Sequence, residues 1–304
     1  MPPLIVGMQG PQGSGKTTLT TQLKQSLEKL SRESLSEDQN RSGDSCRLSL
    51  AICSVDDLYL PFEGLQRVAQ QSPNNRLLQG RGQPGTHDLE LGSEILASLK
   101  RINAEGQNGQ CLHLPIFDKS QHGGRGDRAK QSIVVNAPVD VVLLEGWCLG
   151  FKSLTTEELS KKWDKAQQQG NHSNSSSSLY FTSHTLEDLK TINSHLAEME
   201  KAWYSHIDAY VQLVPLSPKE EPAQSSLHNV FQWRLQAEHA MKDANGGKGM
   251  SDEQVHSFIE RYMPGYELFG NQEWEGAAID SQWKGRTLRI ALGREREVLS
   301  VQHC

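Results

Sequence analysis

The sequence predicts a three-layer α/β fold, in which helices cover a mostly parallel central sheet. Three observations support this prediction. Short apolar runs suited to buried strands recur along the 304 residues. Segments with apolar residues at helical spacing separate these runs, as they do in a sheet with crossover helices. The first apolar run, at residues 4–6, leads into a glycine-rich loop and then a helix over residues 18–30, which is the order of a nucleotide-binding unit.

The glycine-rich loop matches a phosphate-binding pattern. Residues 10–17 read GPQGSGKT and fit G-x-x-x-x-G-K-[ST], the Walker A pattern, at every fixed position. Gly13 and Gly15 allow backbone N–H groups to turn toward phosphate oxygens, and the helix that follows adds the positive end of its dipole. Lys16 can reach the β- and γ-phosphates of ATP, and the Thr17 hydroxyl can bind Mg²⁺. A glycine-rich turn before an ordinary helix is the alternative, and the flanking strand and helix argue against it. The expected nucleotide contacts are Gly10, Pro11, Gln12, Gly13, Ser14, Gly15, Lys16, Thr17 and Thr18. The loop specifies the fold further, as that of a P-loop NTPase.

Composition excludes several classes of function. The formal net charge of −6 argues against a protein that binds nucleic acid by neutralising phosphates. No apolar run reaches the roughly 18 residues of a membrane span. The five cysteines are scattered without metal-binding spacing, which favours reduced thiols in the cytosol. Because the first strand begins by Leu4, we expect no signal peptide and a cytoplasmic protein, with the nucleus as a second location. Monomer and homodimer both remain open.

We expect one domain over residues 1–304, interrupted by polar insertions near residues 31–47, 159–178 and 215–227. The first reads as a surface loop, the second as a disordered Ser- and Gln-rich tract, and the third as a Pro- and Ser-rich loop. Other segments predict regular elements. They are helices over 185–207, 229–241 and 251–262, and strands over 209–214 and 287–292.

Acidic residues follow two of the predicted buried strands. The strand over residues 48–54 leads into Asp56 and Asp57, and the carboxyl end of a parallel strand lies beside the phosphate loop. Asp56 can serve as a base toward an acceptor hydroxyl or as a metal contact, whereas the alternative is a helix N-cap. Asp57 and Tyr59 are expected to lie near the acceptor. The strand over 139–144 ends at Glu145, where a carboxylate can hold Mg²⁺ near Thr17; capping the strand end is the alternative.

Two further loops are candidates for the acceptor site. The loop over residues 81–88 precedes a helix, and Thr86 or Asp88 can cap that helix. The loop over residues 118–128 follows a strand that Pro115 assigns to a sheet edge, and it reads either as a solvated hairpin or as a binding loop. The basic side chains of both loops would suit a small anionic substrate. The acceptor-site candidates are Arg81, His87, Asp88, Lys119, Arg125 and Arg128.

A helical hairpin near residues 229–262 has the form of a lid. Arg234 lies on its first helix and Lys248 in the glycine turn, and their charges could neutralise a transferring phosphoryl group. An exposed helical hairpin is the alternative. Ser251 and Gln254 fit a capping box at the start of the second helix.

These residues carry a family resemblance. The phosphate loop, SVDDLY at 54–59 and the EG pair at 145–146 together resemble the phosphoribulokinase, uridine kinase and pantothenate kinase group. More closely, the chain resembles the D-glycerate 3-kinase family, whose fungal members are described as ATP-dependent kinases. The matching strings are RGQPGTHD at 81–88, FDKSQHGGRGDR at 117–128, LLEGWCLGF at 143–151, FQWRLQAEHAM at 231–241, GKGMSDEQV at 247–255 and RYMPGYE at 261–267.

The resemblance implies roles for individual residues. Asp56 matches the catalytic base, Glu145 the Walker-B-like acid, and Arg234 the lid arginine. Lys16 is the third catalytic residue, and Thr17, Glu145 and Asp56 are the expected Mg²⁺ contacts. The implied activity is transfer of the γ-phosphoryl group of ATP to a hydroxyl of D-glycerate, giving 3-phosphoglycerate. The alternatives are a uridine- or pantothenate-type kinase and a nucleotide-switched binding protein, although no N-K-x-D guanine-reading string is present.

Overall fold

The computed structural model describes residues 1–37, 48–104, 111–172, 179–216, 226–244, 246–270 and 281–304. Its central sheet has six strands in the order β2-β5-β1-β6-β7-β8. The first five are parallel, and β8 pairs antiparallel with β7 at the edge. The strands are β1 Leu4–Gln9, β2 Leu50–Ser54, β5 Val141–Gly146, β6 Ala209–Pro215, β7 Thr287–Leu292 and β8 Val298–His303. The predicted mostly parallel sheet is therefore confirmed.

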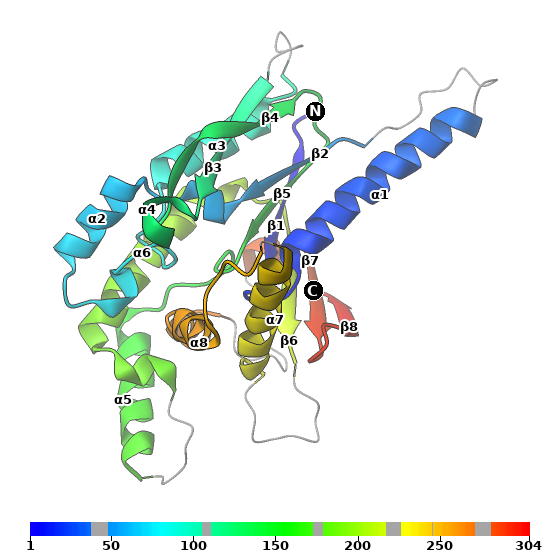
Figure 1. Ribbon diagram of the computed structural model, residues 1–304. Helices are drawn as coiled ribbons and strands as arrows, with labels where there is room; N and C mark the ends of the chain where they lie inside the picture. Colours follow the sequence, from blue (N-terminus) through cyan, green and yellow to red (C-terminus); the bar gives the residue numbers. More distant parts are fainter. Residues whose placement is uncertain (38–47, 105–110, 173–178, 217–225, 245, 271–280) are drawn as a thin grey trace.

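Helices lie on both sides of this sheet (Figure 1). α1 lies on one face, while α3 and α6 pack against each other on the other face. The helices are α1 Lys16–Glu37, α2 Phe62–Gln71, α3 Leu89–Arg101, α4 Gln121–Gly124, α5 Thr156–His172, α6 Leu186–Trp203, α7 His228–Ala244, α8 Asp252–Glu260 and α9 Met263–Leu268. A separate antiparallel pair, β3 Cys111–Asp118 and β4 Asp127–Asn136, projects beside α2 and α4. Among the described residues, no helix is long and apolar enough to cross a membrane.

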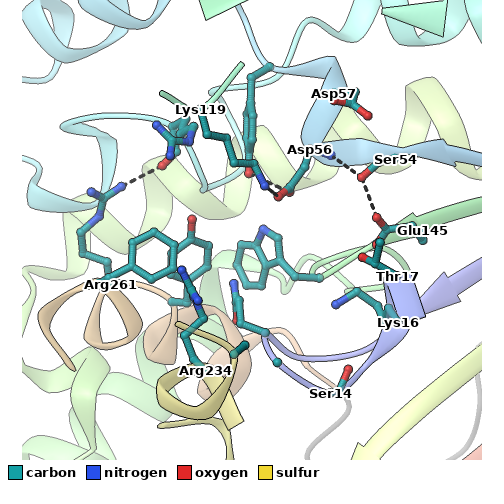
Figure 2. Close-up of a pocket in the computed structure, with 18 of the residues that line it drawn as sticks. Ser14, Lys16, Thr17, Ser54, Asp56, Asp57, Lys119, Glu145, Arg234 and Arg261 are labelled. Carbon is teal, nitrogen blue, oxygen red and sulfur yellow. Dashed lines mark hydrogen bonds and ion pairs between the residues drawn. The ribbon is translucent and has the colours of Figure 1, made fainter. Parts of the chain in front are cut away.

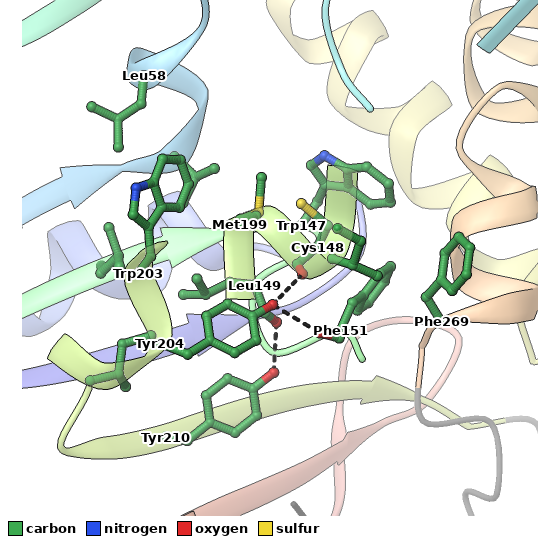
Figure 3. Packing of buried hydrophobic residues seen from close by; sticks show 14 of the residues in the cluster. Leu58, Trp147, Cys148, Leu149, Phe151, Met199, Trp203, Tyr204, Tyr210 and Phe269 are labelled. Atoms are coloured by element: carbon green, nitrogen blue, oxygen red, sulfur yellow. Dashed lines mark hydrogen bonds between the residues drawn. The ribbon is translucent and has the colours of Figure 1, made fainter. Parts of the chain in front are cut away.

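The aromatic core fixes the chain directly after β5 (Figure 3). The Tyr204 hydroxyl donates to the carbonyl oxygen of Phe151 at 2.9 Å, and the Tyr210 hydroxyl donates to that of Leu149 at 2.8 Å. Both tyrosines are fully buried or nearly so, and they pack with Trp283. Because a buried carbonyl without a donor would be costly, these bonds determine the path of residues 147–151. The end of β5, which carries Glu145, is held in place as a result.

Two expectations for the polar stretches are wrong. The helix after the phosphate loop continues to Glu37, so residues 31–37 are not loop. The tract from residue 159 is not disordered up to residue 172, because α5 covers it. Leu159 and Ala166 are buried in the core, and the Glu, Lys and Gln residues of α5 are strong helix formers. The remainder of the predicted insertions, at residues 38–47, 173–178 and 217–225, lies outside the described residues.

Other elements were predicted correctly or missed for identifiable reasons. Asp88 caps α3 through Leu91, and Ser251 with Gln254 forms the capping box of α8. β3 lies in a two-stranded sheet with a register shift after Pro115, which agrees with the edge position expected of it. The 118–128 loop is the turn of this hairpin. β4 and β8 were not predicted: both are largely exposed, and their apolar residues are few, Ile133 to Val135 in β4 and Val298, Leu299 and Val301 in β8.

Candidate active site

One cavity of about 1330 Å³ lies at the carboxyl ends of the parallel strands. The phosphate loop and the start of α1 form one wall, and residues after β2, β3 and β5 line the middle. The side of the cavity next to the phosphate loop is formed by α7, α8 and the β7–β8 hairpin. Its far end is formed by α2 and residues 79–81. Figure 2 shows Lys16, Thr17 and Glu145 on one side of this cavity and Lys119 and Arg261 on the other.

The phosphate loop has the geometry of an anion site. Gly13 and Gly15 adopt φ values of 74° and 90°, which are open to glycine and strained for other residues. The loop wraps around Lys16, whose Nζ donates to the carbonyl oxygens of Gly10 and Pro11 at 2.6 and 3.1 Å. Within the described part of the chain, the N–H groups of Gly15, Lys16 and Thr17 donate to no acceptor. Unpaired N–H groups at a helix N-terminus, next to a lysine, form a binding site for phosphate.

Lys16 is surrounded by protein and by two carboxylates. Burial lowers its pKa, whereas Glu145 and Asp56 raise it. Glu145 accepts a hydrogen bond from the Ser54 hydroxyl at 2.7 Å and is only 9% exposed. Figure 2 shows the Thr17 hydroxyl beside the Glu145 carboxylate.

These oxygen atoms fit a magnesium ion. Mg²⁺ in kinases is held by one or two carboxylates or hydroxyls together with phosphate oxygens of the nucleotide. Thr17, Glu145 and Asp56 all line the cavity and supply such oxygens. In the described parts of the chain, no group of three or more His, Cys, Asp or Glu residues could hold a metal by itself.

Asp56 is an ionised carboxylate in the middle of the cavity. Its two oxygens accept hydrogen bonds from Lys119 Nζ at 2.6 Å and the Tyr59 hydroxyl at 3.0 Å. Burial alone would raise the pKa of Asp56, but Lys119 and Tyr59 outweigh this effect and bring the pKa to about 2. Asp56 is thus an acceptor of hydrogen bonds at physiological pH.

Asp57 has a different partner. Its carboxylate accepts a hydrogen bond from the backbone N–H of Phe117 at 2.9 Å, which joins the end of β2 to β3. Phe117 in turn packs edge-on against Tyr59 with ring centroids 5.3 Å apart. This contact determines where β3 delivers Lys119 to the cavity.

Three arginines gather at the far end of the cavity. Arg81 Nη1 donates to the carbonyl oxygens of Gly124 and Arg125, and Arg261 Nη2 donates to the carbonyl oxygen of Arg81 at 2.8 Å. Arg125 lies over the Phe62 ring at 4.7 Å. Within the described residues, none of the three arginines pairs with a carboxylate. Uncompensated guanidinium groups that face one cavity form a site for an anion.

Arg261 was missed by sequence reasoning. It lies at the end of α8, within a string that the resemblance includes but to which no role was given. Its position beside Arg81 depends on contacts between segments about 180 residues apart, including the bond from Gln83 Nε2 to its carbonyl oxygen.

Three of the predicted acceptor contacts do not line the cavity, and this corrects the sequence-based expectation. His87 is 4% exposed and stacks on Tyr59, and burial lowers its pKa to about 4. Asp88 caps α3 and pairs with Arg128 Nη2 at 2.9 Å. Arg128 also donates to the carbonyl oxygen of Tyr59. These residues support the segment that carries Tyr59, because Asp88 and Arg128 bind each other and the backbone, and His87 packs against the Tyr59 ring.

Arg234 lies in the cavity wall, on α7. Its Nη2 pairs with Glu238 Oε2 at 2.6 Å, and Glu238 also accepts the backbone N–H of Met250. Trp233 of α7 is fully buried, and its backbone lies against the phosphate loop. α7 thus forms a wall of the site, and the closing of a lid over residues 229–262 stays a prediction. Lys248 is exposed and does not line the cavity.

No protein-family model matches the chain. The structure of D-glycerate 3-kinase from Cryptococcus neoformans var. grubii is 40% identical in sequence and superposes with a TM-score of 0.82. That similarity covers 100% of this chain and 90% of the Cryptococcus chain. The chain belongs to the D-glycerate 3-kinase family of ATP-dependent kinases.

Two curated relatives agree with this assignment. The probable ATP-dependent kinase TDA10 of Saccharomyces cerevisiae is 33% identical over 301 residues, which are 99% of this chain and 88% of the yeast protein. The chloroplastic D-glycerate 3-kinase of Arabidopsis thaliana is 35% identical over 271 residues, or 88% of this chain. The match covers 48% of the Arabidopsis protein, so the chain spans about half the length of that relative. The family resemblance noted in the sequence is thereby confirmed.

Proposed function

We propose that this chain transfers the γ-phosphoryl group of ATP to a hydroxyl of D-glycerate, giving 3-phosphoglycerate. One observation carries the proposal. A single cavity joins a phosphate loop, with unpaired N–H groups and Lys16, to arginines without carboxylate partners at its far end. A nucleotide and a small carboxylic acid fit these two ends, and Asp56 lies between them.

At the nucleotide end, Lys16 and the loop amides hold the β- and γ-phosphates. Thr17 and Glu145 would hold Mg²⁺, with Asp56 as a further contact. The ion would supply positive charge that neutralises the phosphate oxygens. Apolar side chains of Leu213 and Leu292 line the cavity beyond the loop and would accommodate the nucleoside.

At the acceptor end, Arg81, Arg125 and Arg261 hold the carboxylate of D-glycerate. Asp56 accepts the hydrogen bond of the reacting hydroxyl and takes its proton as the new O–P bond forms and the bond between the γ-phosphorus and its bridging oxygen breaks, so that ADP leaves. Lys119, paired with Asp56, and Arg234, on the α7 wall, face the phosphoryl group from two sides. Because phosphoryl transfer depends mainly on positioning and charge neutralisation, this arrangement accounts for the chemistry without a covalent intermediate.

The unpaired state of Cys53, Cys111, Cys148 and Cys304 supports a reducing, cytoplasmic location for this activity. The three guanidinium groups of Arg81, Arg125 and Arg261 at the acceptor end favour an acid over uridine as the acceptor. Pantothenate, which is also a carboxylate, remains the alternative to test.

The test is ADP release with Mg-ATP, measured by a coupled assay against D-glycerate, L-glycerate, uridine, pantothenate and no acceptor. Release that depends on D-glycerate supports the proposal. Release with another acceptor would retain the kinase and overturn the choice of substrate. Equal slow release in every tube would instead indicate a nucleotide-switched protein. Conversion of the product that needs phosphoglycerate mutase as well as enolase identifies 3-phosphoglycerate, whereas conversion by enolase alone would show that the other hydroxyl is phosphorylated.

A further inference from the structure

Arg296, in the turn between β7 and β8, joins the phosphate loop to α7. Its Nε donates to the carbonyl oxygen of Gly13 at 2.6 Å, and its Nη2 donates to that of Trp233 at 3.0 Å. Nη1 donates to the side-chain oxygen of Gln236 at 2.7 Å. The guanidinium also lies over the Trp233 ring and lines the cavity. All three guanidinium nitrogens of Arg296 therefore bind either the phosphate loop or α7, which lie at the nucleotide end of the cavity.

The backbone at Arg296 has a conformation that favours glycine. Its φ is 63°, one of two such values at non-glycine residues in the described chain. Residues held there are strained, and they persist where the surrounding contacts determine them. The turn is closed by hydrogen bonds between Gly293 and both Arg296 and Glu297. This geometry directs the Arg296 side chain at the phosphate loop.

The Gly13–Ser14 peptide is fixed at both of its polar groups. The Ser14 N–H donates to the carbonyl oxygen of Pro11 at 3.2 Å, and the Gly13 carbonyl accepts from Arg296. A Cβ at Gly13 would lie 2.5 Å from the backbone of Trp233, so the loop touches α7 directly. The N–H groups of Gly15, Lys16 and Thr17, which have no acceptor among the described residues, follow directly after this peptide. The orientation of this peptide therefore determines where those N–H groups point.

We propose that Arg296 is a positioning residue for the phosphate loop. It holds the Gly13–Ser14 peptide against α7 and keeps the following N–H groups directed at the phosphates of the nucleotide. The inference rests on the proposed function only in assuming that the loop binds a nucleotide. Loss of Arg296 would leave the Gly13 carbonyl without its donor and allow the Gly13–Ser14 peptide to change its orientation. Nucleotide binding would weaken, while the acceptor end of the cavity would be unaffected.

The experiment compares Arg296→Ala and Arg296→Lys with Arg294→Ala as a matched control. Arg294 lies in the same turn and donates to Gln232 of α7, but it does not contact the phosphate loop. Binding of Mg-ADP is measured by calorimetry, together with the KM values for ATP and D-glycerate and the midpoint of thermal unfolding. Hydrogen bonds from a charged donor predict binding of Mg-ADP that is about tenfold or more weaker in Arg296→Ala. Arg294→Ala should bind like the unaltered chain.

The KM for ATP should rise in Arg296→Ala with the KM for D-glycerate unchanged. Arg296→Lys should restore part of the affinity, because an ammonium can reach one carbonyl.

Unchanged Mg-ADP binding in Arg296→Ala would overturn the inference and leave the proposed function standing. A uniform loss of both affinities with a lower unfolding midpoint would also overturn it, since that pattern is a general loss of structure. If Arg296→Ala does not fold, Arg296→Lys decides: weaker Mg-ADP binding at an unchanged midpoint supports the inference, and unchanged binding refutes it. Failure of the unaltered chain to bind Mg-ADP would overturn the proposed function and the inference together.

Discussion

Replacement of Asp56 by asparagine separates the two chemical roles open to this carboxylate. The Asp56→Asn side chain keeps its size, and its one oxygen can still accept from Lys119 while its NH₂ group faces the Tyr59 hydroxyl, but it cannot take a proton. Loss of a general base reduces kcat by about 10²- to 10⁴-fold. Since Asp56 is one oxygen contact among several near the phosphate loop, a base role predicts that the KM for ATP stays within about threefold.

The pH dependence of this variant follows from the pKa of Asp56. With a pKa of about 2, the carboxylate is ionised at every pH from 5 to 9. The ratio of the two kcat values should therefore be constant across that range. If the pKa of Asp56 were near neutrality, the kcat values of the variant and the unaltered enzyme would instead converge at low pH, because Asp56 would be protonated there and neither enzyme would have a base.

The assay is coupled ADP release with D-glycerate and Mg-ATP, with Asp57→Asn as the control. Asp57 accepts the backbone N–H of Phe117, and an asparagine oxygen can still do so, so Asp57→Asn should keep kcat and the unfolding midpoint close to those of the unaltered enzyme. Asp56→Asn with kcat close to that of the unaltered enzyme would refute the base assignment. A rise of more than tenfold in the KM for Mg-ATP, with kcat preserved, would assign Asp56 to the metal instead.

Three further changes test other parts of the structure. Arg81→Ala and Arg261→Ala should each raise the KM for D-glycerate by about tenfold or more and leave the KM for ATP unchanged, because each removes a charged donor from the acceptor end; a shift in the KM for ATP alone would contradict this. Gly13→Ala should abolish Mg-ADP binding or folding, because the new Cβ would lie 2.5 Å from Trp233 at a φ of 74°; a folded protein with full affinity would show that the loop is not packed as described. Burial raises the pKa of Glu267 to about 7 in the folded chain, compared with roughly 4.5 in the unfolded chain. Its contribution to the free energy of unfolding is therefore complete below the unfolded pKa and is lost as the pH rises through 7. Glu267→Gln should therefore reduce the fall in unfolding midpoint between pH 5 and pH 8, and an unchanged pH profile would count against this assignment.

The sequence located the residues that local order and strand ends determine. The phosphate loop is encoded within about 20 consecutive residues, because strand, turn and helix must follow one another to create it. Asp56 and Glu145 were predictable because they directly follow apolar strands, and the carboxyl ends of adjacent parallel strands meet. All three meet in the cavity.

The same reasoning could not tell a residue that faces the cavity from one that faces the core. His87 and Arg128 come from loops of suitable composition, yet they bind or pack against protein around Tyr59. Whether such a side chain is buried depends on which neighbouring segment covers it, and the sequence pattern of the loop does not predict that. The helical part of the 159–178 tract was missed for a related reason, since α5 gains its stability from burying Leu159 and Ala166.

By itself, the sequence determined the nucleotide end of the site and the family, because both reside in contiguous strings whose chemistry is local. Only the tertiary structure added Arg261 and Arg296 to the cavity and excluded His87, Asp88 and Arg128 from it. Arg261 lies beside Arg81 and Arg296 beside Gly13 across 180 and 283 positions of the chain. Arginine is common on protein surfaces, and nothing in the neighbouring residues distinguishes one that folding brings to a functional loop. The physical reason is that a guanidinium acquires its role from the carbonyls and aromatic rings that the fold places around it.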